Sequence, residues 1–197
     1  MRDPDPLTLA PVETSAQGDD PALVAAARRD RRAFGPLYDR YAERVYGYCL
    51  RRLESREAAE DATSLIFTRA ITGLDRFAGG SFAAWLFAIA HNTVTNSYRA
   101  RRPEGPLDAL RELASLSPTP EDLVLRRDDE RLLHQLLAAR PDDQRRVVEL
   151  RLAGLTGVEI AETLGRSLAS VKMLQMRALA RMRACSASDE RDRDGWT

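Results

Sequence analysis

The clearest chemical signal in the chain is a basic helix that follows a capped turn. Thr156 and Glu159 have the T-x-x-E spacing of a capping box, and Gly165 suits the positive φ that ends a helix. Ser167 can then cap a second helix, which carries Lys172, Arg177, Arg181 and Arg183 and no acid up to 185. Two helices around a short turn predict a helix-turn-helix, whose basic second helix fits the major groove of duplex DNA.

Spacings of three and four residues give this second helix two faces. The residues expected to face inward are Val171, Leu174, Ala178 and Met182. Those expected to meet DNA, the turn included, are Ser167, Ser170, Lys172, Gln175, Met176, Arg177 and Arg181. A helical hairpin with a solvated basic face is the alternative, but the cap, the glycine and the charge asymmetry together favour the helix-turn-helix.

The second signal is the stretch 76–102, which mixes aromatic side chains with arginine and asparagine and contains no acid. Rings can stack on unpaired bases, cations can follow the backbone, and asparagine can bond the edge of an extruded base. The residues expected to contact single-stranded DNA are Arg76, Phe77, Gly80, Ser81, Trp85, Asn92, Asn96 and Arg99. The competing interpretation is that the aromatics are core. It is favoured for Phe82, Leu86 and Ile89, and it stays open for Trp85.

The sequence offers no comparable case for catalysis. It lacks GxxxxGK[ST], GxGxxG and GxSxG motifs, and neither its two histidines nor its two cysteines have neighbours at metal-ligand spacing. We therefore expect no catalytic residue, no metal and no cofactor. No apolar run of 18 residues and no signal peptide are seen, so we expect a cytoplasmic protein without membrane insertion.

The net charge of zero seems to speak against a nucleic-acid partner, because such proteins are usually basic. The charge is sorted into blocks, however. The segments 28–56, 76–102 and 144–185 carry net charges of +5, +4 and +5, while acid collects in the tails, in 57–75 and in 103–143. Neutrality thus describes basic surfaces offset by acidic stretches.

The elements that must position these residues are predicted to be helices throughout. We expect an all-α chain of two small helical domains joined by a flexible linker, with the helix-turn-helix in the second. The expected divisions are a disordered acidic tail at 1–20, a first domain at 21–102, a linker at 103–127, a second domain at 128–185 and a polar, frayed tail at 186–197.

In the first domain, the cap residues Asp20, Ser55 and Ser81 are each expected to start a helix. The apolar stripe of the first part is Phe34, Leu37, Tyr38, Tyr41, Val45, Tyr48, Cys49 and Leu53. The core face after Ser55 is expected to be Leu65, Ile66, Ala70 and Leu74, and the stripe after Ser81 to be Phe82, Trp85, Leu86, Ile89 and Thr93.

The linker is marked by four prolines between 103 and 120, and these 18 residues reach at most about 60 Å. Beyond it, a leucine-rich helix is expected to open at Pro120, and Pro141 to restart a helix with Val147, Val148, Leu150 and Leu152. Two DNA-competent modules on such a tether could touch sites more than one turn of B-DNA apart, which is about 34 Å.

At this point the sequence resembles a known family. Residues 21–185 are similar to bacterial sigma factors of the extracytoplasmic-function group, group 4 of the sigma-70 family, which consist of little beyond regions 2 and 4. The resemblance lies in the motifs AAED…F-x-R-A at 58–70, LDRFAGGSFAAWLFAIAHN at 74–92 and RPDDQRRVVELRLAGLTGVEIAETLGRSLASVK at 140–172, in that order and spacing.

The resemblance implies a factor that gives core RNA polymerase its promoter recognition and melts the promoter. Region 2 would bind the β′ coiled-coil and open the −10 element, and region 4 would bind the β-flap and read the −35 element. It places polymerase binding on 56–74, at Asp61, Ser64, Leu65, Thr68 and Arg69. It assigns 76–81 to the −10 loop, with duplex and melted non-template strand as ligands, and it implies an anti-sigma factor as a partner.

Two departures from the family pattern stand out. The family commonly has Gln and then an acid where this chain has Ser64 and Leu65, and often has Ser-Arg where it has Met173 and Leu174. Two other functions are weighed beside this one, and the second of them is motivated by Ser64 and Leu65. One is a two-domain helix-turn-helix regulator that binds an operator without polymerase. The other is a sigma-like chain that binds polymerase or an inhibitor without initiating.

Overall fold

The computed structural model describes residues 20–53, 55–101 and 141–194, with side chains to residue 97 in the second range and to residue 182 in the third. Within these ranges every regular element is helical and none is a strand, which confirms the all-α prediction. The expected linker, the leucine-rich helix after Pro120 and residues 1–19 of the expected tail at 1–20 lie outside the described residues, while Asp20 is the first residue of a helix.

The N-terminal elements form a helical bundle. They are α1 (Asp20–Arg29), the 3-10 turn η2 (Arg31–Phe34), α2 (Gly35–Leu53), α3 (Arg56–Gly73), the 3-10 turn η3 (Leu74–Arg76) and α4 (Phe82–Arg101). The side chains of Ser55 and Ser81 accept hydrogen bonds from the amides of Ala58 and Ala84, at 3.3 Å and 3.2 Å, so both predicted caps are confirmed. The carboxylate of Asp20 instead reaches α2, where it accepts from Arg40 Nη1 at 2.6 Å and from the Tyr41 hydroxyl.

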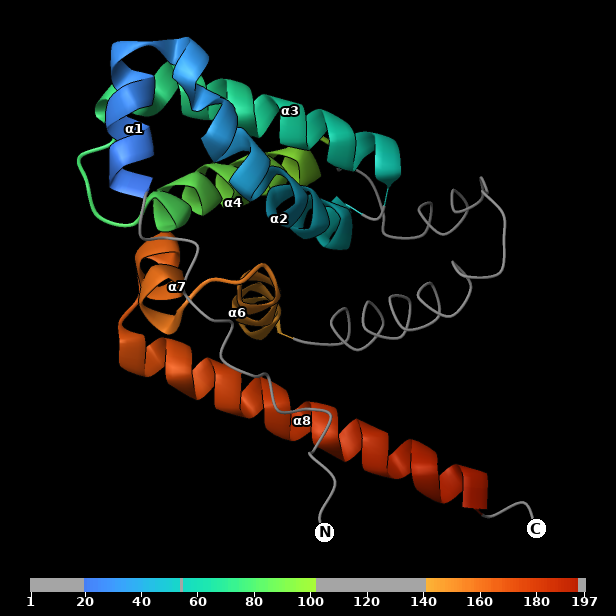
Figure 1. The fold of residues 1–197 in the computed structure, drawn as a ribbon. Helices are drawn as coiled ribbons and strands as arrows, with labels where there is room; N and C mark the ends of the chain where they lie inside the picture. Colours follow the sequence, from blue (N-terminus) through green and yellow to red (C-terminus); the bar gives the residue numbers. More distant parts are fainter. Residues whose placement is uncertain (1–19, 54, 102–140, 195–197) are drawn as a thin grey trace, which may run out of the picture.

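The C-terminal elements are α6 (Asp142–Leu152), α7 (Gly157–Leu164) and α8 (Leu168–Asp194). Figure 1 shows α6 and α7 lying against α2 and α4, with the long α8 as the outer layer on the side away from α3. α8 continues to Asp194, past the expected end at 185, so the predicted end of this helix is wrong. The segment 186–194 contains no proline or glycine, which are the two residues that disfavour a helix most.

One hydrophobic core runs through both groups of helices. Large side chains from α2, α3 and α4, such as Tyr48, Ile66 and Leu86, are fully buried in the same cluster as Leu150, Leu155 and Ile160 from the C-terminal elements. The two predicted domains are therefore packed on one another. Because they share apolar contacts, their relative placement is stabilised by burial as well as by polar contacts.

Two residues assigned to the core are on the surface. Leu65 is 42% exposed, because the buried stripe of α3 runs through Ala62, Ile66 and Ala70 and leaves Leu65 on its flank. Tyr38 is 46% exposed, although the centroid of its ring lies 4.7 Å from that of the Phe67 ring. The exposed Leu65 thus belongs to the outer surface of α3, where the family resemblance also places it.

Candidate nucleic-acid and polymerase interfaces

The expected −10 loop is a glycine turn, and packed aromatic rings support it. Gly79 and Gly80 have φ values of 105° and 86°, a region that side-chain-bearing residues rarely adopt, and space around both is open. Phe77 is only 6% exposed, and the centroid of its ring lies 5.9 Å from that of Phe82 and 5.4 Å from that of Trp85. Phe77 therefore supports the loop, and its ring is not available in this structure to stack on a base.

Arg28 holds the start of this loop, a role that the sequence did not predict. Its Nε donates to the carbonyl of Leu74 at 3.2 Å, and its Nη2 donates to the carbonyl of Phe77. The guanidinium also lies 5.8 Å from the centre of the Phe77 ring. No local sequence signal marks Arg28 for this task, because its partners are 46 and 49 residues away.

A pocket of about 300 Å³ opens between α3 and α4, beside the loop, and is lined by Arg69, Gly73, Arg76, Trp85, Ile89 and Asn92. It brings together three of the residues predicted to meet single-stranded DNA with Arg69, which was predicted to meet polymerase. The set offers two cations, an indole ring and an amide. These are the groups that an extruded base and its phosphate require.

Local packing positions the pocket walls. Arg69 donates from Nη1 to the Thr93 hydroxyl at 2.7 Å, which fixes the guanidinium against α4. A Cβ on Gly73 would lie 3.7 Å from the Trp85 ring, so the indole lies close over this glycine. Asn96, one turn beyond Asn92, is exposed, and the side chain of Arg99 lies outside the described residues.

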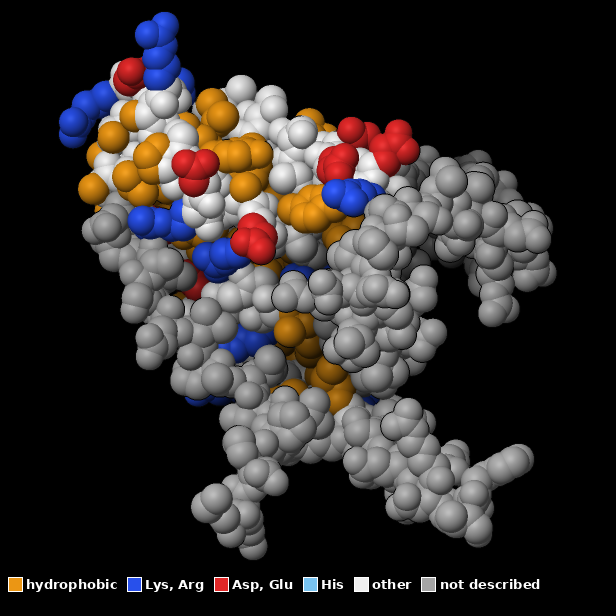
Figure 2. Space-filling view, turned by 45° about the vertical axis from the view of Figure 1, so that its right-hand side comes forward, with side chains coloured by type: hydrophobic (Ala, Val, Ile, Leu, Met, Phe, Trp, Pro, Cys, Tyr) orange, Lys and Arg blue, Asp and Glu red, His pale blue; other side chains and the backbone are white. Residues whose placement is uncertain are grey.

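The outer face of α3 carries the residues that the resemblance assigned to polymerase. Four of the five are exposed on this face: Asp61, Ser64, Leu65 and Thr68. The fifth, Arg69, lines the pocket instead. Figure 2 shows acidic side chains gathered at one end of this surface, where α3 begins with exposed acids at 57, 60 and 61. The face therefore combines a carboxylate end with an apolar and hydroxyl-bearing middle.

The helix-turn-helix has the predicted caps. Thr156 accepts from the Glu159 amide at 3.3 Å while Glu159 accepts from the Thr156 amide at 2.8 Å, and Gly165 has a φ of 62°. The Ser167 hydroxyl accepts from the Ser170 amide at 3.2 Å. The sequence prediction of this motif is confirmed at every cap.

The second helix of the motif, α8, has the two faces expected. Val171, Ala178 and Met182 are buried and Leu174 is partly buried, while exposed positions include Lys172, Met176 and Arg177. Of the other proposed DNA contacts, Ser167 is exposed and Ser170 and Gln175 are partly exposed. Arg181 is exposed too, but its Nη1 donates to Gln144 of α6 at 3.3 Å, so part of its hydrogen-bonding capacity is used within the protein.

Polar contacts join the two domains at the expected −10 loop. Ser81 donates to Oε1 of Glu159 at 2.6 Å, and Thr163 donates to the carbonyl of Ala84 at 3.2 Å. Both contacts place α7 directly against the start of α4. The first helix of the helix-turn-helix therefore lies against the element that follows the −10 loop.

A second set of contacts joins α2 to the end of α6. Arg44 donates from Nε to the carbonyl of Ala153 at 2.8 Å. The next residue, Gly154, has a φ of 84°, and a Cβ there would lie 3.1 Å from the Arg44 guanidinium. A side chain at this position would thus be strained and would also crowd the arginine.

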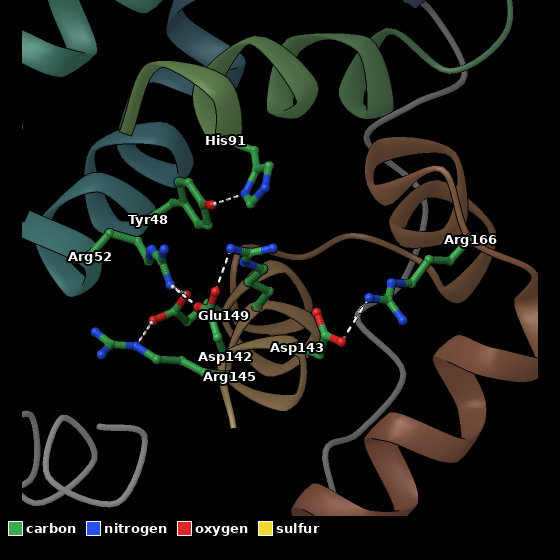
Figure 3. A network of polar contacts seen from close by, with 9 residues as sticks. Tyr48, Arg52, His91, Asp142, Asp143, Arg145, Glu149 and Arg166 are labelled. Atoms are coloured by element: carbon green, nitrogen blue, oxygen red, sulfur yellow. Dashed lines mark hydrogen bonds and ion pairs between the residues drawn. The ribbon is translucent and has the colours of Figure 1, made fainter. Parts of the chain in front are cut away.

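Figure 3 shows the third set, centred on Glu149. This carboxylate is fully buried and accepts from Arg52 of α2 at 3.2 Å and from Arg145 at 2.7 Å. Burial raises its pKa, and the two arginines oppose that rise. Asp142, which is exposed, lies 3.6 Å from the same Arg52.

His91 lies beside this network, and Tyr48 reaches its Nδ1 at 3.2 Å. Burial, together with the positive charges of Arg146 and Arg52, lowers the pKa of His91 to about 4. His91 is therefore neutral at physiological pH. Its environment suits a packed interface histidine and gives no ligand set for a metal.

Two further findings concern metal and thiol chemistry in the described residues. No group of three or more His, Cys, Asp or Glu side chains among them could hold a metal ion, and burial raises the pKa of the Cys49 thiol to about 11. None of the helices in the described part of the chain is long and apolar enough to cross a membrane.

Comparison with known proteins identifies the family. The chain matches the model of Sigma-70 region 2 over residues 37–104 and that of Sigma-70, region 4 over residues 130–182. It is 30% identical over 172 residues to the ECF RNA polymerase sigma factor SigK of Mycobacterium tuberculosis H37Rv, across 84% of this chain and 92% of SigK. The chain belongs to the ECF sigma factors.

Two further relatives agree with this assignment. The ECF RNA polymerase sigma factor BldN of Streptomyces coelicolor is 33% identical over 164 residues, which are 81% of this chain and 62% of BldN. The chain therefore spans less than two thirds of the length of BldN. CnrH, solved in complex with the cytosolic domain of CnrY, is 25% identical with a TM-score of 0.69, over 86% of this chain and 98% of that one.

As an ECF sigma factor, the chain is a specificity subunit of RNA polymerase in transcription initiation. Its region 2 match covers most of α2 and all of α3 and α4, with the −10 loop and the pocket, and its region 4 match covers α6, α7 and the described side chains of α8. Glu149 and Arg44, which join the regions, were not anticipated. A lone acid in the apolar run V-V-E-L was the only available signal for Glu149.

Proposed function

We propose that this ECF sigma factor binds core RNA polymerase through the outer face of α3, captures melted −10 bases in the pocket between α3 and α4, and reads the −35 duplex with α8. The polymerase contacts are the β′ coiled-coil for region 2 and the β-flap for region 4. The chain itself supplies no catalytic group or cofactor, and it acts in the cytoplasm. An anti-sigma factor is its expected inhibitor.

The observation that carries this proposal is the pocket beside the −10 loop. An operator-binding regulator needs its helix-turn-helix but has no use for an open pocket that combines Arg76, Trp85 and Asn92. A strand-melting factor needs such a set, because an extruded base must be stacked, hydrogen-bonded and neutralised at its phosphate. The pocket thus favours the sigma function over the regulator.

The two domains are in direct contact in this structure, and this contact limits how one chain can bind both DNA elements at once. Elements centred at −10 and −35 are separated by about 25 base pairs, roughly 85 Å of duplex at 3.4 Å per base pair. Ser81 and Glu159 are in direct contact in this structure, although they belong to the two different readers. We therefore expect the contacts between the domains to break when one chain engages both elements.

The decisive experiment is transcription in vitro with purified core polymerase, the full-length chain and a library of randomised promoters. The proposal expects co-purification with core and transcripts that start downstream of a shared two-part motif. Co-purification without any transcript would support the sigma-like binder. Specific duplex binding with no affinity for core would support the operator-binding regulator.

A further inference from the structure

Two methionines stand out on the exposed face of α8. Met173 is 49% exposed and Met176 is 66% exposed, and a separation of three residues places them next to one another on the helix surface. Of the six large hydrophobic side chains that are exposed in the described part of the chain, four belong to the helix-turn-helix: Val158, Leu168, Met173 and Met176. Within this group, Met173 and Met176 are neighbours on one face of a single helix, and exposed apolar side chains that lie together mark an interaction site.

The neighbouring charges indicate what that site meets. Lys172 and Arg177, which directly flank the pair in sequence, are both exposed, and α8 holds no acid from residue 168 to 182. Neither cation takes part in an ion pair among the described residues. An apolar protein groove would leave these charges without partners, whereas a duplex supplies phosphates beside its base edges. The observations therefore favour a major groove as the occupant.

Within a major groove, one chemical group matches a thioether side chain. Thymine carries a C5-methyl there, while the other base-edge features are hydrogen-bond donors, hydrogen-bond acceptors or small C–H groups. Covering a donor or acceptor with an apolar side chain leaves that polar group unsatisfied, which is costly. Methionine is unbranched and flexible, so it can adjust to a methyl group on either strand.

We propose that Met173 and Met176 are specificity-determining residues that read thymine methyl groups in the duplex element bound by α8. The inference rests on the proposed function and deepens it, because it states which bases the element must contain. Met173 and Leu174 stand where the family often has Ser and Arg, and of the two only Met173 lies on the exposed face of α8. Leu174 is partly buried and packs against the hydrophobic core.

The test removes the methyl groups one at a time. A promoter selected by the holoenzyme, made from core polymerase and the full-length chain, is resynthesised with single thymines of the −35 element replaced by 2′-deoxyuridine. This change deletes the methyl and keeps every hydrogen-bonding group. For at least one position we expect holoenzyme binding to weaken about fourfold, the effect of one buried methyl group.

Variants then connect each methyl to a side chain. Met173→Ala or Met176→Ala should bind the thymine and deoxyuridine promoters equally well at the position that it reads. Val158→Ala removes a similarly exposed side chain from α7, at 54% exposure, and should keep the wild-type discrimination. All three residues are exposed, so these substitutions should leave folding intact.

Two results would overturn the inference while leaving the proposed function in place. One is equal binding of thymine and deoxyuridine promoters by the wild-type holoenzyme. The other is that the methionine variants lose affinity for core polymerase and keep full discrimination against deoxyuridine, which would assign the pair to a protein contact. If the library yields no bound promoter, the proposed function fails and the inference fails with it.

Discussion

The hydroxyl of Ser81 donates a 2.6 Å hydrogen bond to Oε1 of Glu159, across the boundary between region 2 and region 4. The same Ser81 oxygen accepts from the amide of Ala84 and begins α4, while Oε2 of Glu159 accepts from the amide of Thr156 and begins α7. One pair of side chains thus joins two helix starts. One helix follows the −10 loop, and the other is the first helix of the helix-turn-helix.

Glu159→Ala should weaken the pairing of the two domains, which the shared hydrophobic core also stabilises. The change removes the contact to Ser81 together with half of the capping box, and the weaker cap should cost about 1 kcal/mol of stability. Small-angle X-ray scattering should show a larger radius of gyration. Thr156→Ala is the matched control, because it weakens the same cap and keeps the Ser81 contact. An equal radius of gyration for the two variants would show that the Ser81–Glu159 hydrogen bond does not hold the domains together.

Glu149→Ala should be strongly destabilising. It takes the buried carboxylate away from Arg52 and Arg145, and breaking a buried ion pair typically costs about 3–5 kcal/mol. Asp142→Ala removes an exposed carboxylate 3.6 Å from the same Arg52 and should cost less than about 1 kcal/mol. Urea unfolding measures both. Similar losses of stability for the two variants would show that burial of Glu149 does not set the strength of this network.

Most of the described helices, and the helix starts marked by side-chain caps, were predictable because their signals are local. The caps at Ser55, Ser81, Thr156 and Ser167 each involve an amide three residues away, so a short stretch of sequence contains both partners. Gly165 likewise acts on its own helix end. The inward face of α8 followed from spacing alone.

The pairing of the domains could not be predicted in this way. Its contacts join residues 78 to 109 positions apart, such as Ser81 with Glu159 and Arg44 with Ala153, and no periodicity relates such distant segments. Only part of the pocket lining was predicted from the sequence. Trp85 and Asn92 were expected there as single-strand contacts, but Arg69 was assigned to polymerase because its approach to α4 depends on tertiary packing.

His91 should make stability depend on pH. Its pKa is about 4 in the folded chain and about 6.5 when unfolded, so between these values the unfolded chain binds more protons and stability falls as pH falls. His91→Gln removes this effect. The stability of the wild type relative to the variant, from urea unfolding, should therefore be lower at pH 5 than at pH 7.5.

The comparison with the variant is needed because Glu149 titrates in the opposite sense. Its pKa is raised in the folded chain, so its effect on stability grows more favourable as pH falls. Glu149 is present in both proteins, and its contribution largely cancels in the difference. A pH-independent difference would mean that His91 is not held neutral by burial and by its arginine neighbours.

Trp85→Ala should impair promoter opening more than initial binding. The indole forms a wall of the pocket, so its removal should weaken capture of an extruded base, by about 1–3 kcal/mol per stacked base, and leave duplex contacts intact. Permanganate reactivity of unpaired thymines reports opening, and mobility shift reports total binding. Trp85→Phe keeps a ring and should show a smaller defect. An equal decrease of both signals with a lower Tm would mean that Trp85 serves the core.

Lys172→Ala and Arg177→Ala should each weaken duplex binding and lower its dependence on salt. Removing one cation from a phosphate should reduce the slope of log K against log salt by about 1. Arg181→Ala should change the slope less, because the hydrogen bond to Gln144 holds its guanidinium toward α6. Arg56→Ala on α3 is the control, since that exposed arginine pairs with Glu60 at 3.2 Å, away from α8. An unchanged slope for both the Lys172 and Arg177 variants would mean that another surface binds the phosphates, because exposed cations in a groove must displace counterions when they bind.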